Sequence, residues 1–193
     1  MGLGVRAAQL AAVVSLLAGC AFTPTNLPAA VSLGGFALEG RISVVHGSQN
    51  LSGRIEWAHE PERDEIGLAS PLGTQLAQLV RDANGVTLTD SERRNHRAAD
   101  AETLTEQTLG WRLPLAGLLE WVRARPLAGV ASEVRRDPVG RMVSMAQSDW
   151  QIEYAYDDAV VSAPGLPRRL FMRYLKAVEP LEIRLVIDQW VTR

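Results

Sequence analysis

The chain has 193 residues, of which 47% are hydrophobic, and its 20 basic and 22 acidic side chains leave a net charge of −2 at pH 7. A chain so close to neutral offers no extended basic surface of the kind that nucleic acids require. Its only cysteine, Cys20, excludes an intrachain disulfide, so packing must supply the stability.

The first feature in chain order is a short apolar run that ends at Cys20. Arg6 precedes residues 7–18, which are mostly apolar, and this run is too short to span a bilayer. The sequence Leu17-Ala18-Gly19-Cys20 is typical of a lipobox. It predicts a lipoprotein signal peptide over residues 1–19 and acylation of the cysteine, which would anchor the chain by lipid. The alternative is an ordinary signal peptide with an unmodified cysteine.

Residues 20–33 contain two prolines and several small side chains but no charge. We interpret them as a lipidated tether, with an irregular edge strand as the alternative. Ala21 stands where an aspartate would signal retention in the inner membrane. We therefore expect the chain to be lipid-anchored in the outer membrane and to face the periplasm. The remaining residues, 34–193, are predicted to form a single domain.

The domain begins with strands, because apolar and polar side chains alternate from residue 36 onward. Gly, Pro, Asn and Asp residues separate the alternating segments, which favours an antiparallel meander. A second group of strands follows the helical part of the chain. The predicted strands are residues 36–44, 51–57, 65–69, 75–81, 86–89, 141–147, 150–156, 169–175 and 181–190.

Two helices are predicted between the two groups of strands. Asp100 is a suitable N-cap for the first helix and Gly110 a suitable terminator. The second helix begins near Pro114, has apolar residues at helical spacing, and stops before Pro126. Strands with segregated helices favour a mainly β, α+β fold in which one antiparallel sheet carries the helices on its concave side.

The search for catalytic or cofactor-binding motifs is negative. The sequence contains no Walker loop, dinucleotide fingerprint, HExxH or GxSxG motif, and its three histidines are scattered. We therefore expect no cofactor, no metal and no enzymatic activity. The adjacent carboxylates Asp64-Glu65 and Asp157-Asp158 lie beside predicted turns, and we interpret them as solvated hairpin ends.

The chain is rich in tryptophan, with five residues. Trp57, Trp150 and Trp190 lie on predicted strands, whereas Trp111 and Trp121 flank the second helix. These side chains either fill the core or line an apolar cavity between the sheet and the helices.

Several short motifs follow one another from the lipobox to the end of the chain. They include Phe36-Ala37-Leu38-Glu39-Gly40-Arg41-Ile42, Ile55-Glu56-Trp57, Ile66-Gly67-Leu68-Ala69-Ser70-Pro71-Leu72-Gly73, Gly110-Trp111-Arg112-Leu113-Pro114-Leu115 and Val186-Ile187-Asp188-Gln189-Trp190. Their order and spacing resemble the LolB family of outer-membrane lipoprotein receptors. Residues 130–141 have no such match.

The resemblance implies an incomplete antiparallel β-barrel with a helical lid over an apolar cavity that holds the acyl chains of client lipoproteins. It implies a monomer that receives these clients from a LolA-like periplasmic carrier and inserts them into the outer membrane. The helix from Pro114 to Arg123 would form part of the lid. Leu72 would be the membrane-inserting tip of its turn, unless it folds back onto the sheet. The expected cavity-lining residues are Ile42, Val44, Ile55, Trp57, Leu68, Leu115, Leu118, Leu119, Trp121, Trp150, Ile152 and Tyr154.

Three other functional classes compete with a receptor. A structural outer-membrane lipoprotein of an assembly complex would have a filled interior and bind no acyl chain. A soluble carrier would lack a lipidated cysteine, and a surface hydrolase would need a nucleophile or metal motif. A cluster of Arg168, Arg169 and Arg173 would either dock an acidic carrier or reflect the arginine-rich composition of the chain.

Overall fold

The structure, a computed structural model, describes residues 34–157, 165–176 and 179–192. Its first strands are β1 (Phe36–His46), β2 (Gln49–Glu60), β3 (Arg63–Ala69), β4 (Gln75–Asp82), β5 (Gly85–Asp90) and β6 (Asn95–Ala98). Two helices follow, α1 (Ala101–Leu109) and α2 (Leu115–Trp121). The last strands are β7 (Ser132–Arg136), β8 (Met142–Gln147), β9 (Trp150–Ala155), β10 (Arg169–Tyr174) and β11 (Leu181–Thr192). The predicted signal peptide, Cys20 and the tether lie outside the described residues.

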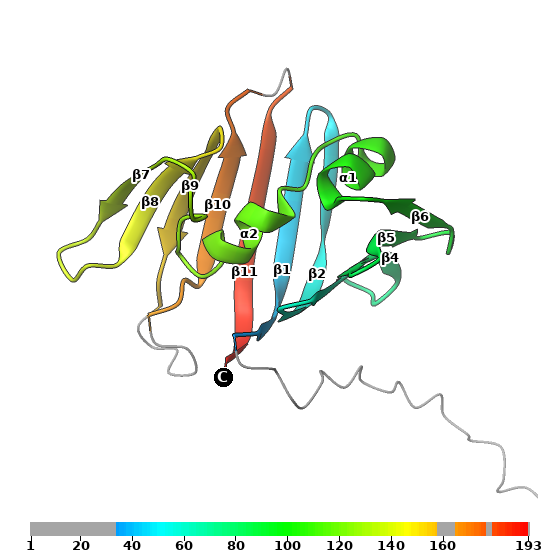
Figure 1. The fold of residues 1–193 in the computed structure, drawn as a ribbon, viewed down its shortest axis with the longest axis horizontal. Coiled ribbons are helices and arrows are strands. Elements are labelled where there is room, and N and C mark those ends of the chain that lie inside the picture. The colour runs from blue at the N-terminus through cyan, green and yellow to red at the C-terminus, as the bar shows by residue number, and fades with distance from the viewer. Residues whose placement is uncertain (1–33, 158–164, 177–178, 193) are drawn as a thin grey trace, which may run out of the picture.

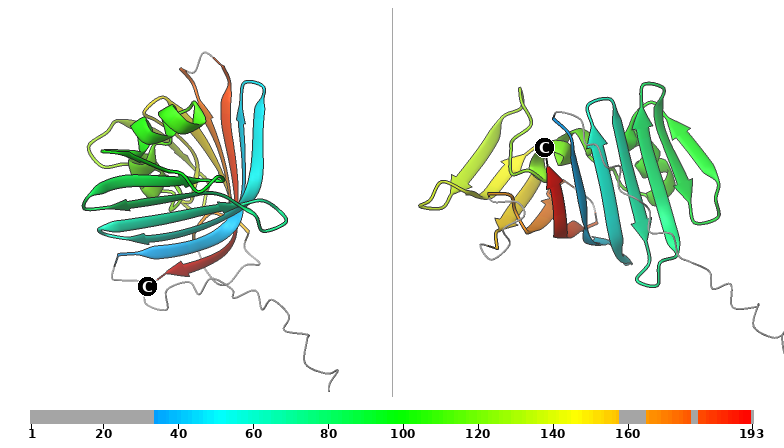
Figure 2. Two further views of the ribbon diagram at one scale, coloured as in Figure 1. Left: turned by 90° about the vertical axis from the view of Figure 1, so that its right-hand side faces the viewer. Right: turned by 90° about the horizontal axis from the view of Figure 1, so that it is seen from below.

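All these strands belong to one antiparallel sheet, in the order β6-β5-β4-β3-β2-β1-β11-β10-β9-β8-β7. β1 lies in the middle, between β2 and the C-terminal strand β11. The sheet curls around the helices, but the edge strands β6 and β7 do not pair with each other, so the barrel is incomplete (Figures 1 and 2). The predicted α+β fold with an open barrel and helices on its concave side is confirmed.

Two glycines allow neighbouring strands to approach closely in the curved part of the sheet. A Cβ atom on Gly40 would lie 2.2 Å from the carbonyl oxygen of Val186, and one on Gly53 would lie 2.4 Å from that of Ala69. The register between β1 and β11 also shifts beside Gly40. Bulges and close backbone contacts of this kind increase the local bend of a strand, which helps the sheet to enclose a volume.

The helices begin and end close to the positions predicted from sequence. The carboxylate of Asp100 accepts a hydrogen bond from the backbone N–H of Thr103 at 2.7 Å, and Gly110 ends α1 in the left-handed region with φ 79°. α2 follows Pro114 and ends at Trp121, so it is shorter than the predicted helix over residues 114–123. Both helices lie on the concave side of the sheet (Figure 2).

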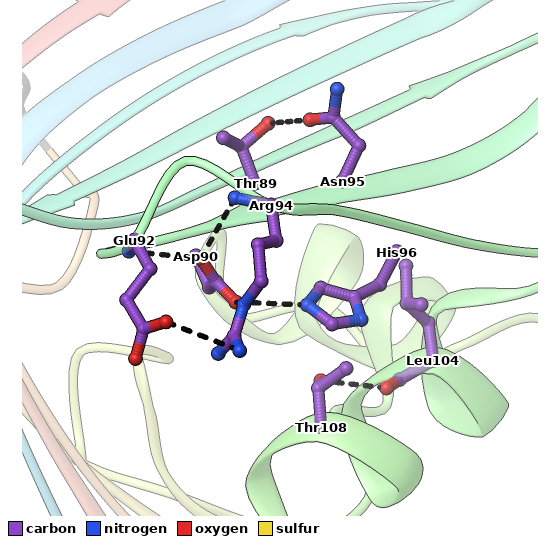
Figure 3. Close-up of polar contacts among 8 residues, drawn as sticks. All are labelled: Thr89, Asp90, Glu92, Arg94, Asn95, His96, Leu104 and Thr108. Carbon is purple, nitrogen blue, oxygen red and sulfur yellow. Dashed lines mark hydrogen bonds and ion pairs between the residues drawn. The ribbon is translucent and has the colours of Figure 1, made fainter.

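The two edge strands were not predicted, because neither has an alternating apolar pattern. β6 is held by Asp90 at the end of β5 (Figure 3). One carboxylate oxygen of Asp90 lies 2.9 Å from His96 Nε2 and 2.9 Å from Arg94 Nε, and the other accepts from the backbone N–H groups of Glu92 and Arg94. The contact with His96 contributes most to holding the pKa of Asp90 below its usual range. β7 is exposed along its whole length and pairs with β8.

Candidate functional site: an apolar cavity under the helices

A cavity of about 450 Å³ lies between the concave face of the sheet and the helices. Sites for small molecules typically have volumes of roughly 300–1,000 Å³, so this cavity is large enough to hold a ligand. Its floor is formed mainly by the side chains of Ile42, Val44, Leu51, Ile55, Trp57, Ile66, Leu68, Leu79, Leu88, Ile183 and Leu185. Its roof includes Leu109, Trp111, Leu113, Leu118 and Val122.

The floor is continuous because the strand register aligns its residues. Ile55 of β2 lies opposite Leu68 of β3, and Ile66 lies between Trp57 on one side and Leu79 of β4 on the other. Alternate residues of a strand point to the same face, so each strand contributes every second side chain to this surface. Cross-strand neighbours of this kind pack against each other and form an unbroken apolar floor.

Among the described lining residues, the polar side chains are those of His46, Gln49, Thr105 and Thr108. The Thr105 hydroxyl donates to the carbonyl oxygen of Ala101 at 2.8 Å and accepts from the backbone N–H of Leu113 at 2.8 Å. The Thr108 hydroxyl donates to the Leu104 carbonyl oxygen at 2.7 Å (Figure 3). Among the described lining residues there is no Asp, Glu, Lys or Arg. The cavity therefore offers a mainly hydrocarbon surface, with no carboxylate, ammonium or guanidinium group among its described lining residues.

The structure brings half of the expected cavity residues to this site. Those that line it come from β1, β2, β3 and α2, and they are Ile42, Val44, Ile55, Trp57, Leu68 and Leu118. The others lie on α2 or β9 and are not among its lining residues. They are Leu115, Leu119, Trp121, Trp150, Ile152 and Tyr154.

The second group lies elsewhere because the end of α2 packs directly against β8 and β9. Trp121 Nε1 donates to Gln147 Oε1 at 2.9 Å, and the rings of Trp121 and Trp150 are 6.1 Å apart. Gln147 Nε2 in turn donates to the carbonyl oxygens of Leu127 and Val130, which holds the chain after α2 against the sheet. The interior thus has a filled half under β8 and β9 and a hollow half under β1 to β5 and β11.

The expectation that Asp64 is solvated is wrong. Its side chain is fully buried, and its Oδ1 lies 3.0 Å from Trp57 Nε1 and 2.9 Å from His59 Nδ1. Its Oδ2 accepts a hydrogen bond from Arg81. Burial by itself raises the pKa of Asp64, but the hydrogen bonds from His59, Trp57 and Arg81 together lower it. Because Trp57 belongs to the floor of the cavity, this network also fixes part of that floor in place.

Leu72 lies at the tip of the turn between β3 and β4 and is 96% exposed. The backbone N–H of Gly73 donates to the Ser70 carbonyl oxygen at 2.9 Å, and that of Thr74 donates to Ser70 Oγ at 3.1 Å. These bonds fix the turn without drawing Leu72 onto the sheet. In the side view of Figure 2 the turn projects from the convex side, opposite the helices.

The described part of the chain contains neither a candidate metal site nor a helix that could span a membrane. No group of three or more His, Cys, Asp or Glu side chains there has an arrangement that could hold a metal ion. Neither of the two described helices has the length and apolar character needed to cross a membrane.

Comparison with known proteins identifies similar sequences along most of the chain. The family model described as outer membrane lipoprotein LolB matches residues 35–190. The outer-membrane lipoprotein LolB of Nitrosomonas europaea is 41% identical over 157 residues, which cover 80% of this chain and 72% of that protein. The one of Thiobacillus denitrificans is 36% identical over 188 residues, covering 96% of this chain and 97% of that protein. Among solved structures, a LolA superfamily protein from Nitrosomonas europaea has a TM-score of 0.45 at 9% identity and covers 82% of this chain and 86% of that one.

Proposed function

The chain belongs to the LolB family of outer-membrane lipoproteins, and from this membership we propose that it receives lipoproteins from a periplasmic carrier and inserts them into the outer membrane. The cavity would hold the client's acyl chains during this transfer. The observation that supports the proposal most strongly is the cavity itself, which is large, mainly apolar and lined by no Asp, Glu, Lys or Arg side chain among the described residues.

The energetics of acyl chains favour transfer by direct exchange. Burying a CH₂ group is worth about 0.8 kcal/mol, so a 16-carbon chain gains on the order of 12 kcal/mol on leaving water. A client would therefore almost never be released into water. When the client passes from the carrier cavity to this cavity and then to the bilayer, its acyl chains exchange one apolar surrounding for another. A difference of about 1.4 kcal/mol in binding free energy at each step shifts the transfer equilibrium tenfold toward the next site.

The membrane contact in this proposal is made by two features. Acylated Cys20 would hold the chain at the outer membrane, where several acyl chains give firm attachment. Leu72 would enter the bilayer at the end of its exposed turn. Full burial of a leucine side chain is worth roughly 1.5–3 kcal/mol, which is comparable with the bias that drives each transfer step.

The chain in this proposal works as a binding and transfer protein and catalyses no reaction. Its partners would be a LolA-like carrier, the acylated ends of client lipoproteins and the membrane surface. The direction of transfer would follow from relative affinities, because the sequence contains no nucleotide-binding motif.

Displacement of an apolar fluorescent probe from the purified full-length protein tests acyl-chain binding. A triacylated peptide that carries the N-terminal residues of a lipoprotein should displace the probe, whereas the same peptide without acyl chains should not. Equal displacement by the two peptides, or no probe binding, would favour a structural lipoprotein of an assembly complex instead.

A further inference from the structure

The outer face of the sheet carries a row of arginines drawn from three strands. Arg54 of β2 lies opposite Arg41 of β1. On its other side, Arg41 lies opposite Val186 of β11, which in turn lies opposite Arg169 of β10. Neighbouring strands are about 4.8 Å apart, so the row extends over about 15 Å. All three arginines are exposed. We call these three residues the arginine row.

The arginine row lies on the convex face, away from the cavity. Ile42 and Ile55, which follow Arg41 and Arg54 in sequence, both line the cavity. Because successive residues of a strand point to opposite faces, the two arginines point outward. Leu170, the residue after Arg169, is buried, and it assigns Arg169 to the outer face in the same way.

The arginine row begins at the base of the turn that carries Leu72. Arg54 lies opposite Ala69, the last residue of β3, and Leu72 follows three residues later. The turn projects from the same convex side of the sheet (Figure 2). An exposed apolar tip and a line of exposed guanidinium groups therefore share one face of the molecule.

The charges on this face are incompletely neutralised. Asp188 binds Arg41 through two hydrogen bonds, at 2.9 and 3.0 Å. Arg54 and Arg169 form no ion pair or side-chain hydrogen bond with another described residue, although the Asp188 carboxylate also attracts Arg54. The carboxylates of Glu39 and Glu56 occupy the adjacent row, where these residues lie opposite each other. The three arginines thus form a line of positive charge beside a row that carries carboxylates.

An aromatic residue lies beside the arginine row, next to two arginines that both pair with Glu182. Phe171 of β10 lies opposite Arg184 of β11, one row from the arginine row. The guanidinium carbons of Arg173 and Arg184 lie 5.3 and 5.2 Å from the centre of the Phe171 ring. Phe171, Arg169 and Arg184 also line a shallow depression on this face. Cationic and aromatic side chains together are typical of surfaces that contact a membrane interface.

We propose that the arginine row docks the convex face on the anionic headgroup layer of the membrane and thereby directs Leu72 into the bilayer. This inference rests on the proposed membrane contact of Leu72. A lipid anchor holds a protein near a bilayer but leaves its orientation free. Guanidinium groups bind headgroup phosphates well, and each basic residue near an anionic surface strengthens binding by about fivefold.

The test uses the full-length protein with Leu72→Cys, labelled with an environment-sensitive dye and reconstituted into vesicles. One set of vesicles contains phosphatidylethanolamine with phosphatidylglycerol, and the other contains phosphatidylcholine alone. A blue shift of the dye reports entry of the turn into the bilayer. The double substitution R54Q/R169Q removes the two unpaired arginines of the row. The control R112Q/R125Q removes the same charge from exposed positions beside the helices, where these arginines pair with Glu106 and Glu120.

On the anionic vesicles, R54Q/R169Q should lower the docking equilibrium constant by about 25-fold, whereas R112Q/R125Q should leave it nearly unchanged. Added salt should weaken docking of the parent protein. Equal docking by the two double variants, or equal docking on the two kinds of vesicle, would overturn the proposal. So would a loss of client uptake from the carrier without any change in docking, since that result would assign the row to a protein partner. Probe displacement by acylated peptide should be the same in all variants, which separates this test from that of the cavity.

Discussion

The indole N–H of Trp57, in the floor of the cavity, donates a 3.0 Å hydrogen bond to the fully buried carboxylate of Asp64. The two residues lie on adjacent strands, and His59 and Arg81 complete the shell around the same carboxylate. A buried carboxylate is tolerated only when it is paired and hydrogen-bonded. Part of the floor of a mainly apolar cavity is therefore held in place by the buried Asp64 carboxylate behind it.

Replacing this carboxylate by an amide should destabilise the protein at neutral pH. Asp64→Asn leaves Arg81 without its partner, and we expect a loss of about 3 kcal/mol in the free energy of unfolding by urea. Glu65→Gln, at the adjacent and partly exposed carboxylate, should cost less than about 1 kcal/mol. Similar losses in the two variants would contradict a structural role for the buried network.

The same network predicts how stability depends on pH. The pKa of Asp64 is lowered in the folded state, so its contribution is fully present above the ordinary aspartate pKa of about 4. That contribution is lost as the pH falls from there through the folded-state pKa. The stability difference between the parent protein and Asp64→Asn should therefore shrink in this acidic range. A difference that stays constant down to the acid-unfolded state would exclude the linkage.

Curvature of the sheet should depend on the close contact at Gly40. Gly40→Ala places a methyl group 2.2 Å from the Val186 carbonyl oxygen, whereas Gly67→Ala meets its nearest atom at 4.0 Å. We expect the first change to cost about 1–3 kcal/mol or more in unfolding free energy, as overpacking does, and the second to cost much less. Thermal unfolding of the two variants under identical conditions measures the difference.

Occlusion of the cavity should weaken acyl-chain binding without unfolding the protein. Ile42→Trp adds bulk inside the cavity, whereas Val45→Trp adds the same kind of side chain on β1 outside the set of lining residues. Titration with an apolar probe should give a lower affinity for the first variant and an unchanged affinity for the second. Tolerance of tryptophan at position 42 with unchanged probe affinity would show that the acyl chain binds elsewhere.

A charge at the turn tip should separate client binding from client delivery. Leu72→Glu should leave acyl-probe affinity unchanged but slow transfer to vesicles by about tenfold. The reason is that it removes roughly 1.5 kcal/mol or more of the free energy gained when the leucine side chain is buried in lipid. Val139→Glu, at another exposed apolar position, is the matched control and should have little effect. The proposed role of Leu72 fails if the Leu72 variant loses binding but delivers its bound client at a normal rate.

The sequence predicted the fold well where a local pattern was present. Alternation identified the central strands, and the N-cap Asp100 and terminator Gly110 located α1 within a residue. β6 and β7 were missed because they are polar edge strands held by side-chain contacts, such as those of Asp90, and by pairing with a single neighbour. Periodicity detects burial, and an edge strand has little of it.

The site was only partly predictable for a related reason. Alternation shows that Trp57 and Trp150 both face the interior, but it cannot show which interior position is filled. That distinction depends on Trp121, whose bond to Gln147 draws α2 onto β8, and those two residues are far apart in sequence. Asp64 was misread for the same reason, since its partners His59 and Arg81 meet it only in the folded sheet.

Acyl-chain binding in the cavity is tested most directly by mapping where a bound chain lies. A triacylated peptide with a photoreactive group on one chain would be cross-linked to the full-length protein, and the modified residues would be identified by mass spectrometry. An acyl chain bound in the cavity should give cross-links to the hollow half of the interior, at residues such as Leu68, Leu79 and Leu109, and these should be lost in Ile42→Trp. Cross-links confined to the convex face, or equal labelling by a photoreactive peptide without acyl chains, would contradict acyl-chain binding in the cavity.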